Sequence, residues 1–151
     1  MREQKKGRII NISSLAAVLS LPFQGFYSST KAALNSLFNA LQSEVKPFNI
    51  QISNILPGDI KTEFTQNREK NQLDLPHYQT RLQKSLSVME KDEQNGMPPL
   101  SIAQAVLRLA EAKKPKLTYV VGCKYKIVYL LSKILPSAFV NAIIGKIYGG
   151  E

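Results

Sequence analysis

The pattern of apolar positions predicts an alternation of strands and helices along the 151-residue chain. Two short runs rich in isoleucine, residues 7–13 and 50–56, are typical of buried strands. Between them, residues 24–44 carry apolar side chains at helical spacing, and Pro47 closes this helix. A strand, a helix and a second strand in this order indicate a right-handed parallel crossover.

The second half of the chain predicts the same alternation. Its polar beginning, residues 59–97, is expected to form one or two helices, the second over 77–92. The remaining expected elements are a helix over 101–112, a strand over 117–122 and helices over 124–135 and 137–148. Three strands alternating with helices predict an α/β fold with a parallel sheet. Residues 1–6 resemble the tail of a helix that leads into the first strand.

The composition narrows the class of protein. The single cysteine, Cys123, excludes an internal disulfide and fits a reducing cytoplasm, which is where we expect the protein. No run of about 18 apolar residues is present, so the sequence predicts no transmembrane helix. Metal-ligand spacing, a helix-turn-helix signal and an arginine-rich arm are also missing, so we expect neither a metal site nor a nucleic-acid partner.

The distribution of charge indicates a possible membrane-binding segment near the C-terminal end of the chain. The net charge is +9, and residues 113–146 contain seven lysines and no acidic residue. Lysines interleaved with apolar positions suit an anionic surface, so peripheral membrane contact is one expectation, while a solvated helix face is the alternative. Within a complete domain, one helical stripe in this segment is expected to be buried against the substrate cleft or the sheet rather than in lipid. The stripe consists of Ile127, Leu130, Leu131, Ile134 and Leu135.

The candidate chemistry centres on Tyr27 and Lys31, which lie four residues apart and therefore share one face of the long helix. A lysine ammonium beside a phenol favours the phenolate, which makes the tyrosine a usable acid or base. The same spacing recurs at Tyr129 and Lys133, so spacing alone does not choose between the two pairs. We interpret Tyr129 as a packing residue on a terminal helix.

Context favours Tyr27. Ser14 follows the first predicted strand, and Pro57-Gly58 follows the second. Ligands of open α/β sheets bind outside the carboxyl ends of the strands, so these residues are expected to converge on one edge.

Three segments together resemble the short-chain dehydrogenase/reductase family: GRIINISS, then YSSTKAAL with a serine thirteen residues before its tyrosine, then PGDIKT. The resemblance covers about residues 7–64. It implies that Tyr27 is the proton donor or acceptor for the substrate oxygen, and that Lys31 assists it and holds the nicotinamide ribose. It further implies that Ser14, rather than Ser13, hydrogen-bonds the substrate oxygen.

The resemblance also implies NAD or NADP as the cofactor. Pro57 and Gly58 would form a backbone wall beside the nicotinamide, Thr62 would contact its carboxamide, and Ile60 belongs to the same cofactor-binding segment. The family's Gly-rich phosphate loop is not found, since the eight glycines include no G-x-x-x-G-x-G arrangement. The chain is therefore expected to be the C-terminal half of a doubly wound Rossmann-type domain and inactive by itself.

Within this single domain we expect a catalytic core over 7–64, a substrate-loop region over 65–97 and the C-terminal helices with the last strand over 98–151. The expected function is interconversion of a lipophilic alcohol with its ketone or aldehyde, as in hydroxysteroid-, retinol- and acyl-dihydroxyacetone-phosphate-like reductases. An inactive remnant that binds a membrane or a partner is the alternative, and an epimerase-like relative is a third, less favoured because of Pro57-Gly58 and Thr62. Leu34, Leu37, Phe38 and Leu41 on the long helix predict that the intact form is a homo-oligomer.

Overall fold

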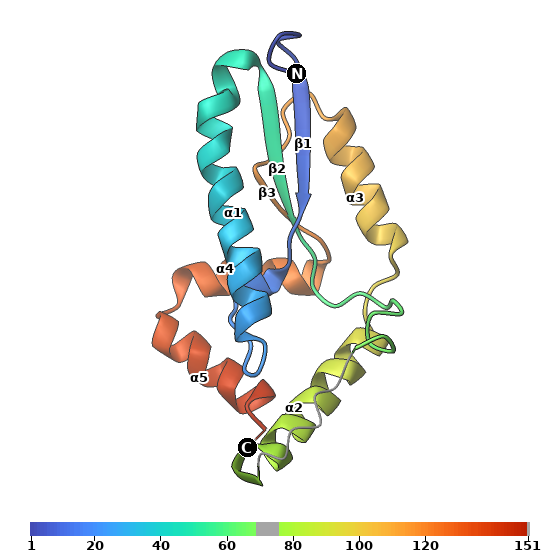
Figure 1. Ribbon diagram of the computed structural model, residues 1–151, viewed down its shortest axis with the longest axis vertical. Helices are drawn as coiled ribbons and strands as arrows, with labels where there is room; N and C mark the ends of the chain where they lie inside the picture. The colour runs from blue at the N-terminus through green and yellow to red at the C-terminus, as the bar shows by residue number, and fades with distance from the viewer. Residues whose placement is uncertain (69–75, 151) are drawn as a thin grey trace.

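Three parallel strands form the central sheet of the computed structural model, which describes residues 1–68 and 76–150 (Figure 1). They are β1 (Gly7–Ile12), β2 (Ile50–Leu56) and β3 (Thr118–Val120), in the spatial order β1-β2-β3. The central strand, β2, is buried at nearly every position, including its polar residues Ser53 and Asn54. The pairing between β1 and β2 keeps the two strands in register, so they end at the same edge of the sheet.

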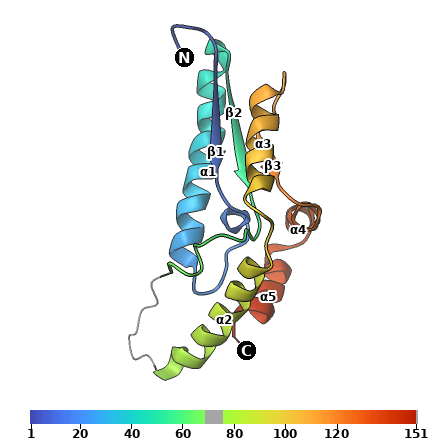
Figure 2. The same cartoon turned by 90° about the vertical axis from the view of Figure 1, so that its right-hand side faces the viewer.

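Two helices cover the two faces of this sheet (Figure 2). The long helix α1 (Gly25–Val45) packs on one face against β2, and α3 (Leu100–Glu111) packs on the other. Ile55 of β2 is fully buried in a cluster with residues of α3, Ala105 and Leu109. The α/β layers and the parallel sheet that the sequence predicts are therefore confirmed.

The remaining helices gather beyond the carboxyl ends of the strands (Figure 1). They are α2 (Pro76–Gln94), α4 (Cys123–Ile134) and α5 (Ser137–Tyr148). A second core cluster joins α5 to the short 3₁₀ turn η1 (Leu15–Ala17) through buried Leu15, Leu19 and Ile144. Among residues 1–68 and 76–150, no helix is both long and apolar enough to cross a bilayer.

Several boundaries differ from the sequence-based expectations. Strand β3 is shorter than 117–122 because it pairs only with the last residues of β2, and Gly122, at φ +89°, turns the chain into α4. Residues 2–5 form a turn rather than a helix tail, and Lys5 has a left-handed φ of +46° that no α-helix accommodates. The helix expected over 77–92 is α2, whereas residues 59–68 contain no helix and 69–75 lie outside the described residues.

The α1 helix leaves part of its apolar surface uncovered by the described residues. Leu34 and Leu37 are exposed, while Phe38 and Leu41 are half-buried. The expectation that this helix mediates self-association stays a prediction.

A chain of side-chain amides joins the sheet to α1. Asn54 of β2 is almost fully buried; its oxygen accepts from Asn11 Nδ2 at 2.9 Å, and its nitrogen donates to Asn39 Oδ1 at 3.0 Å. Buried amides are costly unless they are paired, so these bonds fix β1, β2 and α1 relative to one another.

Arg8 ties β1 to the last turn of α3. Its guanidinium donates from Nη1 to the carbonyl oxygen of Leu109 at 2.6 Å and to that of Ala110, and from Nη2 to Ala112 O at 2.8 Å. These carbonyls lie at the negative end of the helix dipole and lack helical partners, so a cation there satisfies them and stabilises the end of the helix.

Replacing Arg8 with methionine is predicted to lower the free energy of unfolding by about 2 kcal/mol, because the apolar stem is retained while the charged donors are lost. Urea denaturation followed by circular dichroism measures this quantity. Arg2→Met, at an exposed position in the N-terminal turn, is the control and should change it by no more than about 0.5 kcal/mol. Equal stability of Arg8→Met and the native chain would refute this account of the anchor.

Candidate active site

Two backbone hydrogen bonds extend the β1–β2 pairing beyond the strand ends. Ser13 N donates to Ile55 O at 2.9 Å, and Leu15 N donates to Pro57 O at 2.8 Å. Ser14 lies between these two bonds, directly beside the end of β2. Its hydroxyl oxygen accepts from Ala16 N at 3.1 Å and caps η1, which fixes the direction of its side chain.

Tyr27 and Lys31 lie on the first turns of α1. The Lys31 ammonium is 5.8 Å from the centroid of the Tyr27 ring and donates to Ile12 O, at the end of β1, at 3.3 Å. Ser13, which is 4% exposed, donates from its hydroxyl to Lys31 O at 3.4 Å. Ser13 therefore fastens the end of β1 to α1, and the Tyr27–Lys31 pair is held against the same edge of the sheet as Ser14.

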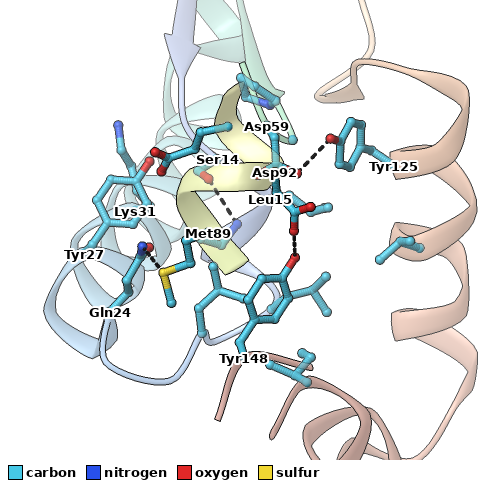
Figure 3. A pocket seen from close by; sticks show the side chains of 18 of the residues that line it. Ser14, Leu15, Gln24, Tyr27, Lys31, Asp59, Met89, Asp92, Tyr125 and Tyr148 are labelled. Carbon is cyan, nitrogen blue, oxygen red and sulfur yellow. Dashed lines mark hydrogen bonds between the residues drawn. The ribbon is translucent and has the colours of Figure 1, made fainter. Parts of the chain in front are cut away.

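One cavity of about 1140 Å³ collects every residue that the sequence predicts for the site. Its lining includes Ser14, Tyr27, Lys31, Pro57, Gly58, Ile60 and Thr62. Figure 3 shows Ser14, Tyr27 and Lys31 together on one side, with Tyr125 and Tyr148 across from them. The predicted residues thus share one space, while their chemical roles stay predictions.

Most of the remaining cavity wall is apolar. These residues come from the loop after β1, the start of α1 and helices α2, α4 and α5. They include Leu15, Ala16, Leu19, Leu21, Phe23, Phe26, Leu82, Leu86, Met89, Val128, Leu131, Leu135, Val140, Ile143, Ile144 and Ile147. A cavity of this size and lining suits a ligand with a long or bulky apolar part and one polar end.

The second tyrosine–lysine pair lies elsewhere. Lys133 Nζ is 5.4 Å from the Tyr129 ring, so the pair resembles Tyr27 and Lys31 in its own geometry. Tyr129, however, packs against the cluster of Leu15, Leu19 and Ile144 and does not line the cavity. Its interpretation as a packing residue is confirmed, and surroundings rather than spacing separate the two pairs.

The positions that the sequence predicts to bind the cofactor differ in their surroundings. A Cβ atom at Gly58 would lie 2.2 Å from Cδ1 and Cε1 of Tyr125, so the tyrosine ring occupies the space that a side chain would need. Ile60 forms a parallel bridge with Met97 that anchors the segment after β2. Thr62 is exposed, and its hydroxyl accepts from Phe64 N at 3.2 Å.

Two tyrosine–aspartate pairs form the polar part of the opposite wall (Figure 3). Tyr125 donates its hydroxyl to Asp59 Oδ2 at 2.8 Å, and Tyr148 donates to Asp92 Oδ2 at the same distance. Burial raises the pKa of Tyr125 to about 12 and also raises the pKa of Tyr148. Burial likewise raises the pKa of Asp59; the bond from Tyr125 lowers it, and the charge of Asp92 raises it further. Both tyrosines therefore stay neutral donors at ordinary pH.

Sequence reasoning missed these four residues. Asp59 directly follows Pro57-Gly58, and its position beside the end of β2 was a usable signal. Asp92, Tyr125 and Tyr148 come from α2, α4 and α5, and no spacing in the sequence indicates that they meet.

Comparison with known proteins identifies the architecture. The family described as short chain dehydrogenase matches residues 1–73. The 3-ketodihydrosphingosine reductase of Bacteroides thetaiotaomicron is 37% identical over 135 residues, which cover 88% of this chain and 50% of that protein. The chain belongs to the short-chain dehydrogenase/reductase family. Membership in this family confirms the resemblance drawn from the three sequence segments.

Two further proteins are similar to this chain. The NADPH-dependent 3-dehydrocapnine reductase of Ornithobacterium rhinotracheale is 30% identical over 146 residues, or 93% of this chain and 50% of that protein. A solved short-chain dehydrogenase from Streptomyces avermitilis superposes with a TM-score of 0.71 at 27% identity, covering 97% of this chain and 52% of its own. The chain thus spans about half the length of the relatives it matches.

The raised pKa of Asp59 predicts how stability depends on pH. Its folded-state pKa lies above the ordinary value of 3.8. Between these two values the folded chain binds more protons than the unfolded chain, so the contribution of Asp59 to stability falls as the pH rises through this window. Asp59→Asn removes the titration and keeps an acceptor for Tyr125. We expect its stability relative to the native chain to be greater at about pH 7 than at about pH 3.

Urea unfolding of both proteins at the two pH values measures this difference. Tyr125→Phe serves as the opposite control, because it removes the hydrogen bond that lowers the pKa of Asp59 and should steepen the loss of stability with rising pH. A stability difference between Asp59→Asn and the native chain that does not change with pH would show that Asp59 titrates normally.

Proposed function

We propose that the chain is the catalytic and substrate-binding part of an NAD(P)-dependent oxidoreductase that interconverts a lipophilic alcohol with its ketone or aldehyde. The observation that carries this proposal is that Ser14, Tyr27 and Lys31 line the same cavity as a large set of apolar side chains. Family membership supports oxidoreductase chemistry, and the cavity wall supports the class of substrate.

Each polar residue has a role that its contacts support. The Ser14 oxygen already accepts from Ala16 N, so its hydroxyl proton is available for a substrate oxygen. Ser14 is proposed only to hydrogen-bond that oxygen, while Tyr27 transfers the single proton to it during reduction and accepts that proton back during oxidation. The Lys31 ammonium, which donates to Ile12 O and lies 5.8 Å from the centroid of the Tyr27 ring, is proposed to stabilise the phenolate that remains.

The cofactor is proposed to be NAD or NADP, which when bound supplies or accepts the hydride at the substrate carbon. Tyr27 and Lys31 line the cavity from α1 and are proposed to contact the ribose, and Pro57, Gly58, Ile60 and Thr62 line the same space. One relative is named for its dependence on NADPH, which supports a nicotinamide cofactor.

A ketone is the favoured oxidised substrate. Two relatives are named as reductases of a 3-keto and a 3-dehydro compound. Apolar side chains from α2, α4 and α5 surround the space in front of Tyr27, so the part of the substrate beyond its carbonyl is proposed to be hydrocarbon.

Tyr27→Phe tests the acid–base role. The variant keeps the ring but removes the transferable proton, and turnover should fall about 100-fold or more. The assay is ketone-dependent oxidation of NADPH or NADH by a fusion in which this chain follows the dinucleotide-binding segment of a family member. Tyr129→Phe is the matched control, since it alters the other tyrosine–lysine pair outside the cavity, and it should keep near-native turnover. Native turnover in Tyr27→Phe would remove Tyr27 from the mechanism.

Nucleotide binding gives an independent prediction. The 151 residues contain no G-x-x-x-G-x-G arrangement, whose backbone N–H groups at a helix N-terminus hold the pyrophosphate. The chain alone is therefore expected to bind neither NADH nor NADPH with micromolar affinity in titration calorimetry, whereas the fusion should bind one of them. Micromolar binding by the chain alone would contradict this expectation.

A further inference from the structure

The outer side of α4 is a continuous apolar stripe. Ile127, Leu130, Leu131 and Ile134 are 61%, 59%, 46% and 70% exposed. The opposite side of the helix, with Tyr125, Val128 and Tyr129, packs inward against the cluster around Leu15. Leu131 and Leu135 of the stripe also line the cavity, and the expectation that the stripe is buried within a complete domain stays a prediction.

Exposed lysines border this stripe on both sides. With about 3.6 residues per turn, Lys124 falls along one edge of the stripe and Lys126 and Lys133 fall along the other. Lysine stems extend along apolar surface while their ammonium groups reach polar surroundings. An apolar stripe between two rows of cations matches the boundary between the acyl chains and the phosphates of an anionic lipid surface.

Helix α5 continues the apolar surface and connects it to the cavity. Phe139, Ile143 and Ile147 are exposed at intervals of four residues. Ile143 and Ile147, together with Leu131 of α4, also line the cavity. The same side chains thus belong to the cavity wall and to the exposed apolar surface.

We propose that this α4–α5 surface, formed by the four stripe residues and by Phe139, Ile143 and Ile147, docks on an anionic lipid bilayer. We further infer that a lipophilic substrate enters the cavity from that bilayer past Leu131, Ile143 and Ile147; this second step rests on the proposed function. In this proposal the two helices lie on the bilayer surface; none of the described helices is long and apolar enough to cross it.

The positive charge around the α4–α5 surface favours anionic lipid, rather than a second copy of the chain, as the partner that binds there. A two-fold interface would place the same surface on both partners, so its lysines would face lysines. Residues 113–146 offer no acidic side chain to pair with them. Lipid phosphates supply the missing negative charge, and each lysine near an anionic leaflet strengthens binding.

A tryptophan at the stripe tests the docking. The chain contains no tryptophan, so Ile134→Trp introduces a single fluorescent reporter at an exposed position. With vesicles of equal parts phosphatidylcholine and phosphatidylglycerol, its emission should shift to the blue and be quenched by brominated acyl chains. Adding Lys126→Gln and Lys133→Gln should weaken partitioning roughly 30-fold, the effect of removing two charges from an anionic surface. About 1 M salt should weaken it as well.

Leu107→Trp is the matched control, since Leu107 on α3 is 58% exposed and lies outside the surface; its emission should not change. Unchanged emission of Trp at position 134 would overturn the proposal. So would a blue shift that appears without vesicles and grows with protein concentration in parallel with dimer formation, or salt-independent binding to pure phosphatidylcholine. These readouts do not involve catalysis, so a failure here leaves the Tyr27 assay as a separate test of the proposed function.

Discussion

The candidate site depends on the continuation of the β1–β2 ladder beyond its last strand residues. The bonds from Ser13 N to Ile55 O and from Leu15 N to Pro57 O place Ser14 beside Pro57 and Gly58. From there, Ser13 and the Ile12 carbonyl hold Lys31, and with it the first turn of α1 that carries Tyr27. A parallel sheet with in-register strands thus brings groups from separate segments to one edge without a covalent link.

The part of this arrangement that rests on local pattern was predictable from the sequence. Isoleucine-rich runs specify β1 and β2, and helical spacing specifies α1, because both periodicities arise from which side of an element is buried. The order of these elements then places Ser14, Tyr27 and Pro57-Gly58 on one edge. Spacing alone was insufficient at Tyr129, whose partner Lys133 has nearly the same geometry, and the surroundings of the two tyrosines distinguish them.

Features that depend on contacts between distant segments were not predictable. The bonds of Tyr125 with Asp59 and of Tyr148 with Asp92 join residues 66 and 56 positions apart, and no periodicity encodes such meetings. The sequence pattern was also insufficient to orient α4, because this helix is apolar on two sides. Its pattern shows that a stripe exists, but only the packing of Tyr125, Val128 and Tyr129 shows which side faces inward. The outward side, bordered by lysines, is the surface that we propose docks on a lipid bilayer.

The central claim is that one cavity binds the polar end of a lipophilic ligand at Tyr27 and its hydrocarbon along α4 and α5. Intermolecular nuclear Overhauser effects between the chain and a long-chain methyl ketone test this claim most directly. The account predicts contacts from the protons next to the carbonyl to the Tyr27 ring, and from the distal methylenes to the methyl groups of Val128, Val140 and Ile144. Contacts confined to the exposed side chains of Ile127 and Ile134, or a carbonyl end far from Tyr27, would contradict it.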